Sequence, residues 1–394
     1  MERRHDIDAL RVFAFAFLIL YHVAMFYVAE WEWHIKSSYI SEWLQYPMLF
    51  MNRWRMALLF LLSGIAIGLV NPAGRALGFA GSRTFRLLVP LLFGMFVVVP
   101  VQAYCQGVSN GLVAPGYLDF MLRYWTFQPW PRDAFDGWEY GITWNHLWYL
   151  AYLWVYTMLL CALMRFSDSR AGTWLRDRLA GLRGARLIVL PMLPFAVYLY
   201  TLAHFPSTND LLNDWFQHAM YFTVFLYGWA LGRDRAVWEE LVRLRRWTLA
   251  IAVTLGLIYV PFVLSLDDDA PIGVLLIART IRAAYLWTAL MAILGWGKAC
   301  LDRPFRWLPK ANEAIFPCYV LHQSLIVLIG YWLAPLKLGP VLEPLLVLAG
   351  TVGGCWVIYV SLIRPFNLLR PFFGMKWRQR AAPAASQAAT ACAS

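Results

Sequence analysis

Long apolar runs separated by short polar segments dominate this chain. Windows of about twenty mostly apolar residues recur along it, which is the length that a helix needs to cross roughly 30 Å of hydrocarbon. The windows fall near residues 7–29, 47–70, 83–105, 146–165, 186–204, 218–232, 247–265, 272–297, 313–334 and 340–363. The pattern predicts an all-α, polytopic integral membrane protein with about ten transmembrane helices.

Three of the polar segments carry further information. Residues 106–145 are rich in aromatic residues, Gly and Pro, and we expect them to form a folded loop on the outer membrane surface. Residues 166–185 are Arg-rich and are expected in the cytoplasm. The Ala- and Ser-rich residues 381–394 are predicted to be a disordered cytoplasmic tail, which leaves residues 1–380 as one transmembrane domain.

The composition excludes a water-soluble protein. Of the 394 residues, 61% are hydrophobic and 14% are charged, whereas roughly a quarter are charged in soluble proteins. The net charge of +11 does not indicate a nucleic-acid partner, because the basic clusters are separated by membrane-length runs and form no continuous face. The six cysteines include no C-x-x-C pair, so neither a disulfide framework nor a metal site is expected.

The distribution of basic residues predicts the orientation. Cytoplasmic loops collect Lys and Arg, and most of the 34 basic residues fall on the side that holds both termini. The opposite side holds Lys36, Arg123, Arg132 and Lys337. We therefore predict that both termini are cytoplasmic. The first apolar window follows acidic residues and lacks a cleavage site, so we expect a retained helix and not a cleaved signal.

Ionisable side chains inside the predicted helices are functional candidates, because each costs at least about 2.5–3.5 kcal/mol to insert. Arg11 and His22 lie about 16 Å apart along the first helix and only about 20° apart around it, and Asp8 lies about 40° from His22. This face combines an anion-binding group at the cytoplasmic mouth with a proton acceptor in the outer half. The alternative is that Arg11 snorkels to the interface and His22 only packs.

Four arginines lie deeper than the positive-inside rule explains. Arg53 and Arg55 lie within the second predicted helix, where they indicate a water-filled cavity or a bound anion. Arg279 and Arg282 lie one turn apart in the eighth, about 10–15 Å below the outer surface. These positions predict an anionic group within the membrane.

Other motifs permit a structural as well as a functional interpretation. Arg83 and Arg86 point the same way at the cytoplasmic start of the third helix; they either bind a phosphate or follow the positive-inside rule. His146 lies at the outer interface and His322 near the middle of the ninth helix. Gly64-x-x-x-Gly68 is interpreted as helix packing. No H-E-x-x-H, G-x-S-x-G or Walker motif occurs.

Taken together, these residues resemble the membrane acyltransferase 3 family. The matching motifs occur in family order across most of the chain: Asp8-x-Leu10-Arg11 followed by His22, Arg55-Met56 running into Phe60-Leu-Leu-Ser63-Gly64, Arg83-x-x-Arg86 with Pro90, His146-Leu147-Trp148-Tyr149-Leu150, and Tyr319-Val-Leu-His322. Within the family, the chain is most similar to the branch that succinylates osmoregulated periplasmic glucans. That similarity lies in Trp31-Glu-Trp33-His34, Asn312-Glu-Ala and Phe366-Asn-Leu-Leu-x-x-Phe-Phe-Gly374.

The resemblance implies a multi-pass enzyme of the bacterial inner membrane that moves an acyl group from cytoplasmic acyl-CoA to a hydroxyl of a periplasmic glucan. Succinyl-CoA or acetyl-CoA would be the co-substrate, and no permanently bound cofactor is expected. The partners would be acyl-CoA, the glucan and the lipid bilayer. A succinyl group carries a free carboxylate that needs a cation within the membrane, so the excess of arginines favours succinyl over acetyl.

The resemblance also suggests a role for each site residue. His22, kept neutral by desolvation, would be the general base, with Arg11 and Asp8 on the same helix face. The acyl-CoA is expected at Arg83, Arg86, Arg11 and Ser63. The acyl group and the acceptor are expected at Arg55, Arg53, His146, Trp148, Arg279, Arg282 and His322.

Two alternatives stay open on the sequence. The enzyme could transfer another acyl group, such as acetyl, or use another cell-surface glycan. The chain could instead be a proton-coupled anion transporter, with the arginines lining its path and His22 and His322 relaying protons. The sequence shows no repeated halves of the kind that many transporters have.

Overall fold

The computed structural model describes residues 3–70, 72–167, 169–267 and 269–378. Within these ranges the regular structure is helical, and the extended chain pairs only at an isolated bridge between Val28 and Ser41. The helices are α1 His5–Met25, α2 Gln45–Val70, α3 Ala76–Phe93, α4 Pro100–Ser109, α5 Tyr117–Tyr124, α6 Trp148–Met164, α7 Arg170–Ala180, α8 Ala185–Val189, α9 Leu193–Thr201, α10 Trp215–Arg233, α11 Arg235–Leu264, α12 Ile272–Leu301, α13 Leu308–Leu333 and α14 Leu342–Ile358. The all-α prediction is confirmed.

Each predicted span corresponds to a helix or a helix group. Among the described residues, eight helices are long and apolar enough to cross a membrane, and nine if α7 and the segment Ala185–Thr201 form one broken span. That segment is divided into α8, a 3-10 turn and α9 because Pro191 and Pro194 interrupt it. The predicted span 218–232 lies in α10, whose Gln217 and His218 lower its mean hydropathy. These findings establish a polytopic protein, while the count of ten stays a prediction.

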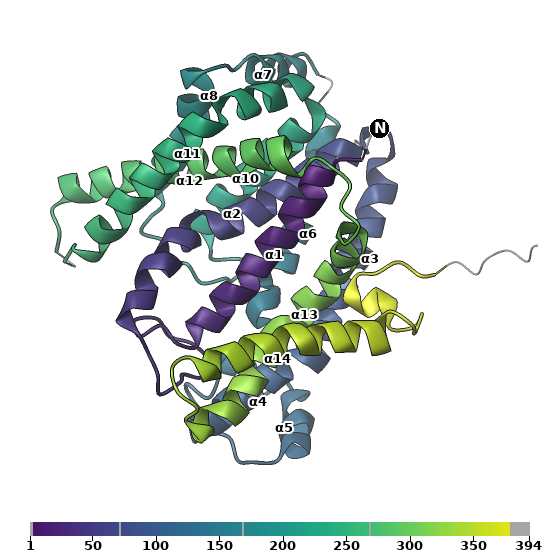
Figure 1. Ribbon diagram of the computed structural model, residues 1–394. Coiled ribbons are helices and arrows are strands. Elements are labelled where there is room, and N and C mark those ends of the chain that lie inside the picture. Colours follow the sequence, from purple (N-terminus) through teal and green to yellow (C-terminus); the bar gives the residue numbers. More distant parts are fainter. Residues whose placement is uncertain (1–2, 71, 168, 268, 379–394) are drawn as a thin grey trace, which may run out of the picture.

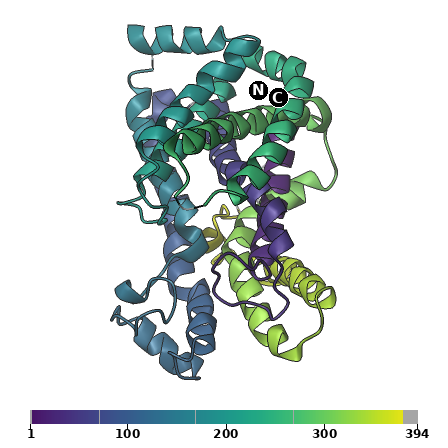
Figure 2. The same cartoon turned by 90° about the vertical axis from the view of Figure 1, so that its left-hand side faces the viewer.

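The two large polar segments lie at opposite ends of the molecule. Helix α7 lies near the start of α1, and α5 lies at the far end (Figures 1 and 2). This arrangement matches the predicted placement of residues 166–185 and 106–145 on different sides of the membrane. That the end with α7 is cytoplasmic stays a prediction from the charge pattern.

Helix α2 packs against α10 through glycines on both helices. A Cβ atom on Gly64 would lie 2.1 Å from the Phe225 carbonyl oxygen, and one on Gly228 would lie 2.1 Å from the Leu61 carbonyl oxygen. The interpretation of Gly64-x-x-x-Gly68 as packing is therefore confirmed. The matching Gly228 and Gly232 pair was readable from the sequence by the same rule.

The third predicted span is one element, Ala76–Ser109. A π-helical turn over Gly94–Val98 separates α3 from α4, and Pro100 begins α4. Because proline has no N–H, it cannot continue the hydrogen-bond ladder of α3. A polar side chain of α4, Gln102, bonds to the turn before α6 and to the middle of α13, which contribute to the site described below.

Residues 106–145 fold around a small core of their own. Phe120, Tyr124, Trp130 and Phe135 are buried together. The Tyr124 hydroxyl accepts a bond from the Thr143 N–H at 3.0 Å, and burial raises the pKa of Tyr124 to about 12. The expectation of a folded loop is confirmed. The predicted tail, residues 381–394, lies outside the described residues.

Candidate active site

Three of the predicted histidines meet where α1, α6 and α13 converge. The Nδ1 atom of His22 lies 2.9 Å from Nε2 of His322, and the planes of the two rings are nearly parallel, at 12°, with their centroids 5.1 Å apart. His146 meets the His322 ring edge-on at 5.0 Å. His322 and His146 are buried, whereas His22 is only half-buried. The structure thus brings together residues from three distant motifs.

Both ring nitrogens of His146 have protein partners. The carbonyls of Tyr319 and Val320 can only accept, so Nε2–H donates to them, at 3.1 and 3.2 Å. Nδ1 then accepts from the side-chain amide of Gln102 at 3.3 Å. The Tyr319 hydroxyl donates to the His146 carbonyl at 2.6 Å. These bonds tie the start of α6 to α13 and leave His146 no free nitrogen with which to act on a substrate.

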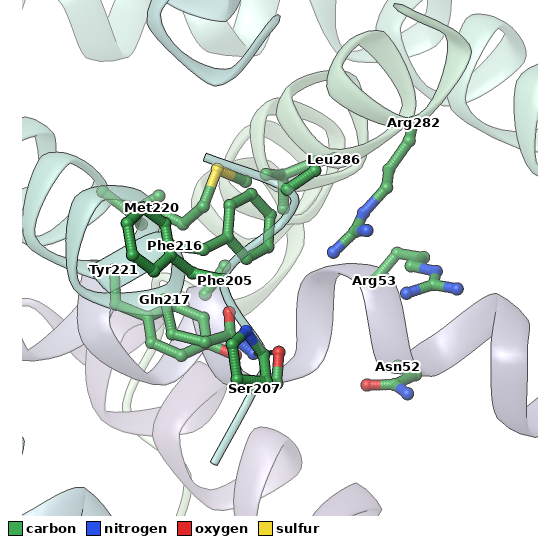
Figure 3. Close-up of a pocket in the computed structure, with 14 residues that line it drawn as sticks. Asn52, Arg53, Phe205, Ser207, Phe216, Gln217, Met220, Tyr221, Arg282 and Leu286 are labelled. Atoms are coloured by element: carbon green, nitrogen blue, oxygen red, sulfur yellow. Dashed lines mark hydrogen bonds between the residues drawn. The ribbon is translucent and has the colours of Figure 1, made fainter. Parts of the chain in front are cut away.

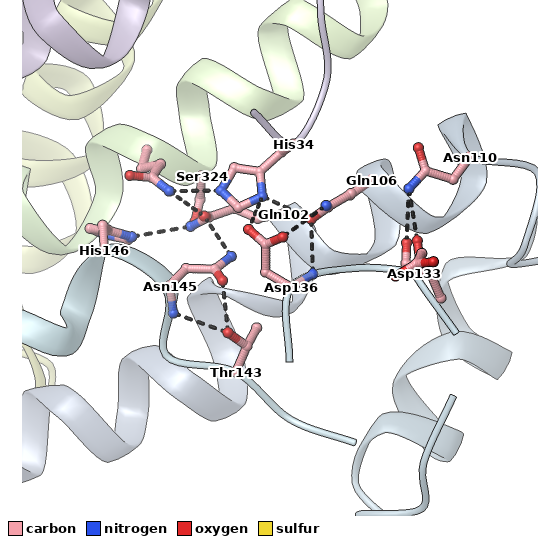
Figure 4. Close-up of polar contacts among 12 residues, drawn as sticks. His34, Gln102, Gln106, Asn110, Asp133, Asp136, Thr143, Asn145, His146 and Ser324 are labelled. Atoms are coloured by element: carbon pink, nitrogen blue, oxygen red, sulfur yellow. Dashed lines mark hydrogen bonds and ion pairs between the residues drawn. The ribbon is translucent and has the colours of Figure 1, made fainter. Parts of the chain in front are cut away.

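A buried network of uncharged polar side chains supports the histidines on the side of the folded segment 106–145 (Figure 4). The Gln102 amide donates to Ser324 Oγ at 2.7 Å, and its carbonyl oxygen accepts from Asn145 and Gln323, both at 3.0 Å. The Gln323 amide also donates to Nε2 of His34 at 2.9 Å. Sequence analysis missed this network, although three of its members lie in predicted spans, where an uncharged amide or hydroxyl also needs a partner.

His34 lies at the far end of this network. It is buried, and its Nδ1 atom lies 2.8 Å from the Gln106 carbonyl oxygen and 3.2 Å from an Asp136 carboxylate oxygen. Gln106 lies near the end of α4 and Asp136 lies farther along the folded segment 106–145 (Figure 4). His34 therefore connects the folded segment 106–145 to α13.

One face of His22 is covered by Trp33. The two rings stack at 29° with their centroids 5.6 Å apart. The Trp33 indole N–H is buried and has no hydrogen-bond partner. The Nε2 atom of His22 likewise forms no hydrogen bond with any described residue, because its one bond uses Nδ1. The site therefore presents a ring nitrogen and an indole donor that the protein itself leaves unused.

Three arginines gather at the end of the bundle where α1 begins. Arg11 lies within electrostatic range of Arg83 and Arg86. No ion pair in the described ranges joins any of the three to a carboxylate. Among the described residues, the Gly374 carbonyl oxygen is the one hydrogen-bond acceptor of the three arginines, at 3.0 Å from Arg86 Nε. The predicted acyl-CoA residues thus form one uncompensated positive cluster.

Ser63 lies next to this cluster through Tyr149. The two hydroxyl groups are 2.8 Å apart, and Tyr149 lies within electrostatic range of Arg11 and Arg83. Tyr149 also donates to the Leu59 carbonyl at 3.2 Å. The predicted position of Ser63 near the acyl-CoA residues is consistent with this arrangement.

Asp8 does not reach the histidines. Its carboxylate accepts from Arg3 at 2.9 Å and from the Asn312 amide at 2.9 Å. Fourteen residues of helix separate Asp8 from His22, which is about 21 Å along the axis. Asp8 therefore anchors the start of α1 to α13. The predicted catalytic role of Asp8 stays a prediction.

A cavity of about 410 Å³ lies among α2, α10, α12 and the segment before α10, and we call it the outer cavity. Arg53 and Arg282 line it together with Asn52 and Gln217 (Figure 3). None of its lining residues is acidic, and the Nε atom of Arg53 is buried without a hydrogen-bond partner. The cavity therefore has the chemistry of an anion site. Arg279 does not line it.

Arg55 lies between the outer cavity and the histidines. Its guanidinium stands 3.4 Å from the Tyr21 ring centroid, and its Nε and Nη1 atoms are buried without partners. It lies within electrostatic range of His22 and His322, and also of Tyr221, which lines the outer cavity. The anion-binding character thus extends from the cavity to the histidine cluster.

Trp148 has no polar role in this arrangement. Its ring packs against Tyr152 at 4.9 Å and Tyr221 at 6.0 Å. It forms an aromatic wall between α6 and α10. Its predicted contact with the acyl group or the acceptor stays a prediction.

Comparison with known proteins adds one finding. The sequence model of a family described as Acyltransferase domain matches residues 4–360, which include every candidate residue discussed above. No curated protein and no solved structure matches the chain.

Proposed function

Because the chain belongs to the acyltransferase 3 family, we propose that it moves an acyl group from cytoplasmic acyl-CoA to a hydroxyl group of a periplasmic glucan. The family supports a membrane acyltransferase. The acyl-CoA donor, the succinyl group, the glucan acceptor and the bacterial inner membrane are our proposals. The observation that carries them is an arginine cluster without a carboxylate partner at the start of α1, together with an unused histidine nitrogen farther along the same helix.

The arginine cluster suits the phosphates of coenzyme A. Arg11, Arg83 and Arg86 have no carboxylate partner among the described residues, so a polyphosphate would supply the missing negative charge. Guanidinium groups also match phosphate geometry through paired donors. Arg11 and His22 are separated by about 16 Å of helix. The flexible pantetheine arm can cover a distance of this order and present the thioester to His22.

His22 would act as the general base. Its Nε2 atom takes the proton of the acceptor hydroxyl while the hydroxyl oxygen bonds to the thioester carbonyl carbon. The tetrahedral intermediate then collapses, the C–S bond breaks, and the proton leaves with the sulfur as free coenzyme A thiol. The developing oxyanion needs donors. Arg55 and the Trp33 indole are the nearby groups whose N–H atoms have no partner.

The deep arginines support a succinyl group. A succinyl chain ends in a carboxylate, which would be costly within the membrane without a cation. Arg53 and Arg282 line the outer cavity, and Arg55 lies between this cavity and His22. An acetyl group would leave these guanidinium groups uncompensated. The charge pattern therefore favours a dicarboxylic donor over a neutral one.

Reconstitution tests the proposal directly. The purified protein is placed in lipid vesicles, labelled succinyl-CoA or acetyl-CoA is supplied on the side of the arginine cluster, and a linear or cyclic glucan is supplied on the other. We expect label on the glucan with succinyl-CoA and much less with acetyl-CoA. Anion flux without transfer from either donor would refute the enzyme and favour the transporter. Efficient transfer of acetyl would refute the succinyl assignment alone.

A further inference from the structure

We infer that His322 is a positioning residue that sets the tautomer of His22 and so leaves Nε2 of His22 as the base. That His22 acts as a base rests on the proposed function. The positions of the two protons, one on each ring, rest on the hydrogen bonds alone. Sequence analysis placed His322 among the groups that contact the acyl group or the acceptor, and the structure assigns it another task.

The chain of hydrogen bonds starts at a carbonyl group. Nδ1 of His322 lies 2.7 Å from the Tyr319 carbonyl oxygen. A carbonyl oxygen only accepts, so Nδ1 of His322 must carry the proton. A neutral imidazole has one N–H, which makes Nε2 of His322 an acceptor. The His22 nitrogen that lies 2.9 Å away must therefore be the donor.

The position of the second proton follows. If Nδ1–H of His22 donates to His322, then Nε2 of a neutral His22 carries the lone pair. This nitrogen forms no hydrogen bond with a described residue, and the His22 ring is half-buried. The Tyr319 carbonyl holds His322, and His322 in turn holds His22, as a third group orients the base in a catalytic triad. Here the orienting group is a second imidazole and not a carboxylate.

This assignment requires that His322 is neutral. Its side chain is 0% exposed, and the Arg55 guanidinium lies within electrostatic range. No carboxylate in the described ranges forms a hydrogen bond or ion pair with either ring. A second buried positive charge next to Arg55 would have no compensating partner. The neutral form is therefore the one that the surroundings of His322 support.

The His322 ring is held in place from several sides. Phe15 meets it edge-on at 5.6 Å, and His146 meets it edge-on at 5.0 Å. The Tyr319 carbonyl also accepts from His146, so that it receives two N–H groups. A ring confined in this way cannot flip to exchange its two nitrogens. Helix α13 thereby determines which nitrogen of His22 faces the reacting groups.

Three variants of His322 separate the positioning role from packing. His322→Leu removes the acceptor, and without it His22 can hold its proton on Nε2, where it cannot accept another. We expect kcat to fall roughly 10- to 100-fold, less than the roughly 10²- to 10⁴-fold contribution of a general base itself, with KM for the acyl-CoA changed less than about 2-fold. His322→Asn can keep the bond to Tyr319 but is too short to reach His22, so it should resemble His322→Leu. His322→Gln restores an acceptor near Nε2 and should recover activity to within about 3-fold.

A double variant shows whether His322 acts through His22. The His22→Ala, His322→Leu protein should be no slower than His22→Ala alone, because a residue that only orients the base has no effect once the base is absent. Effects that multiply would overturn the inference. So would a His322→Gln protein that keeps its thermal unfolding midpoint and is as slow as His322→Leu.

The protonation pattern can be measured without any turnover. Nitrogen-15 NMR of histidine-labelled protein in vesicles, assigned by comparison with His22→Ala and His322→Leu, should show the proton of each ring on Nδ1. A His22 proton on Nε2 would overturn the inference even if the enzyme is active. Absence of transfer from every donor would refute the proposed function and leave the NMR result standing.

His218 offers a matched control. It is half-buried, its Nδ1 lies 2.9 Å from the Tyr156 hydroxyl, and its Nε2 lies 2.9 Å from the Leu211 carbonyl oxygen. His218→Leu therefore also removes two hydrogen bonds of a membrane histidine. We expect a lower unfolding midpoint and a kcat within about 2-fold of the unchanged protein. If His218→Leu lost as much kcat as His322→Leu, the losses of both variants would be explained by packing, and the inference would be overturned.

Discussion

Replacing Arg282 by glutamine tests whether the outer cavity recognises the carboxylate of the donor. The substitution removes one of the two guanidinium groups that line the cavity and leaves a shorter, uncharged polar side chain. Arg53 remains, so the cavity keeps part of its positive charge. We expect kcat/KM for succinyl-CoA to fall while that for acetyl-CoA changes less than about 2-fold.

The expected size follows from the contacts. At about 4 Å and an effective dielectric constant near 20, an ion pair is worth about 4 kcal/mol before desolvation is subtracted. A hydrogen bond to a charged group contributes a net ~1.5–3 kcal/mol. At about 1.36 kcal/mol per tenfold change in rate, the expected loss lies between roughly 10- and 150-fold. The lower half of this range applies if Arg53 compensates.

The assay is competition between the two donors in vesicles, read as the ratio of succinyl to acetyl label on the glucan. Arg245→Gln is the control, because Arg245 lies over the Trp296 ring as Arg282 lies over the Phe216 ring, but Arg245 does not line the cavity. An equal loss with both donors would refute the reasoning, since it would place Arg282 in the general structure. So would an unchanged ratio.

Three further predictions follow from the geometry. His22→Ala should lower kcat at least about 100-fold and leave binding of acyl-CoA, measured by calorimetry, nearly unchanged; full turnover would remove His22 from the mechanism. Arg83→Ala should raise KM for the donor about tenfold with little change in kcat, and an unaltered KM would move the phosphate site elsewhere. Gly228→Ala should destabilise the protein by about 1–3 kcal/mol, seen as a lower thermal unfolding midpoint, because its Cβ would lie 2.1 Å from the Leu61 carbonyl oxygen. Gly353→Ala, which meets open space, is the control, and equal effects of the two would contradict the packing argument.

Local sequence patterns predicted the helices well. Hydropathy over about twenty residues reports on one segment at a time, and each predicted span coincides with a helix or helix group. The pattern was weakest in 186–204, where prolines divide the segment, and in α10, where Gln217 and His218 interrupt the apolar run. Both weaknesses have a local cause that the sequence already contains.

Helical spacing predicted the site only in part. It identified His22, His146 and His322 as separate candidates, and the structure places them in one cluster. It placed Asp8 on the same helix face as His22, but about 21 Å of helix axis separates the two residues, and the catalytic role of Asp8 stays a prediction. It also overlooked Gln102, whose importance lies in its hydrogen-bond partners from α13 and from the turn before α6.

What the sequence determined by itself is a basic, apolar chain of membrane-length helices that carries costly charges and the motifs of the acyltransferase 3 family. Charge, length and spacing are properties of each segment, so they can be read without knowing its neighbours. What only the tertiary structure decided is the contact between His22 and His322, which are 300 residues apart. Which helix packs beside which depends on the fit of whole surfaces, and that fit determines which nitrogen of His22 is left unbonded.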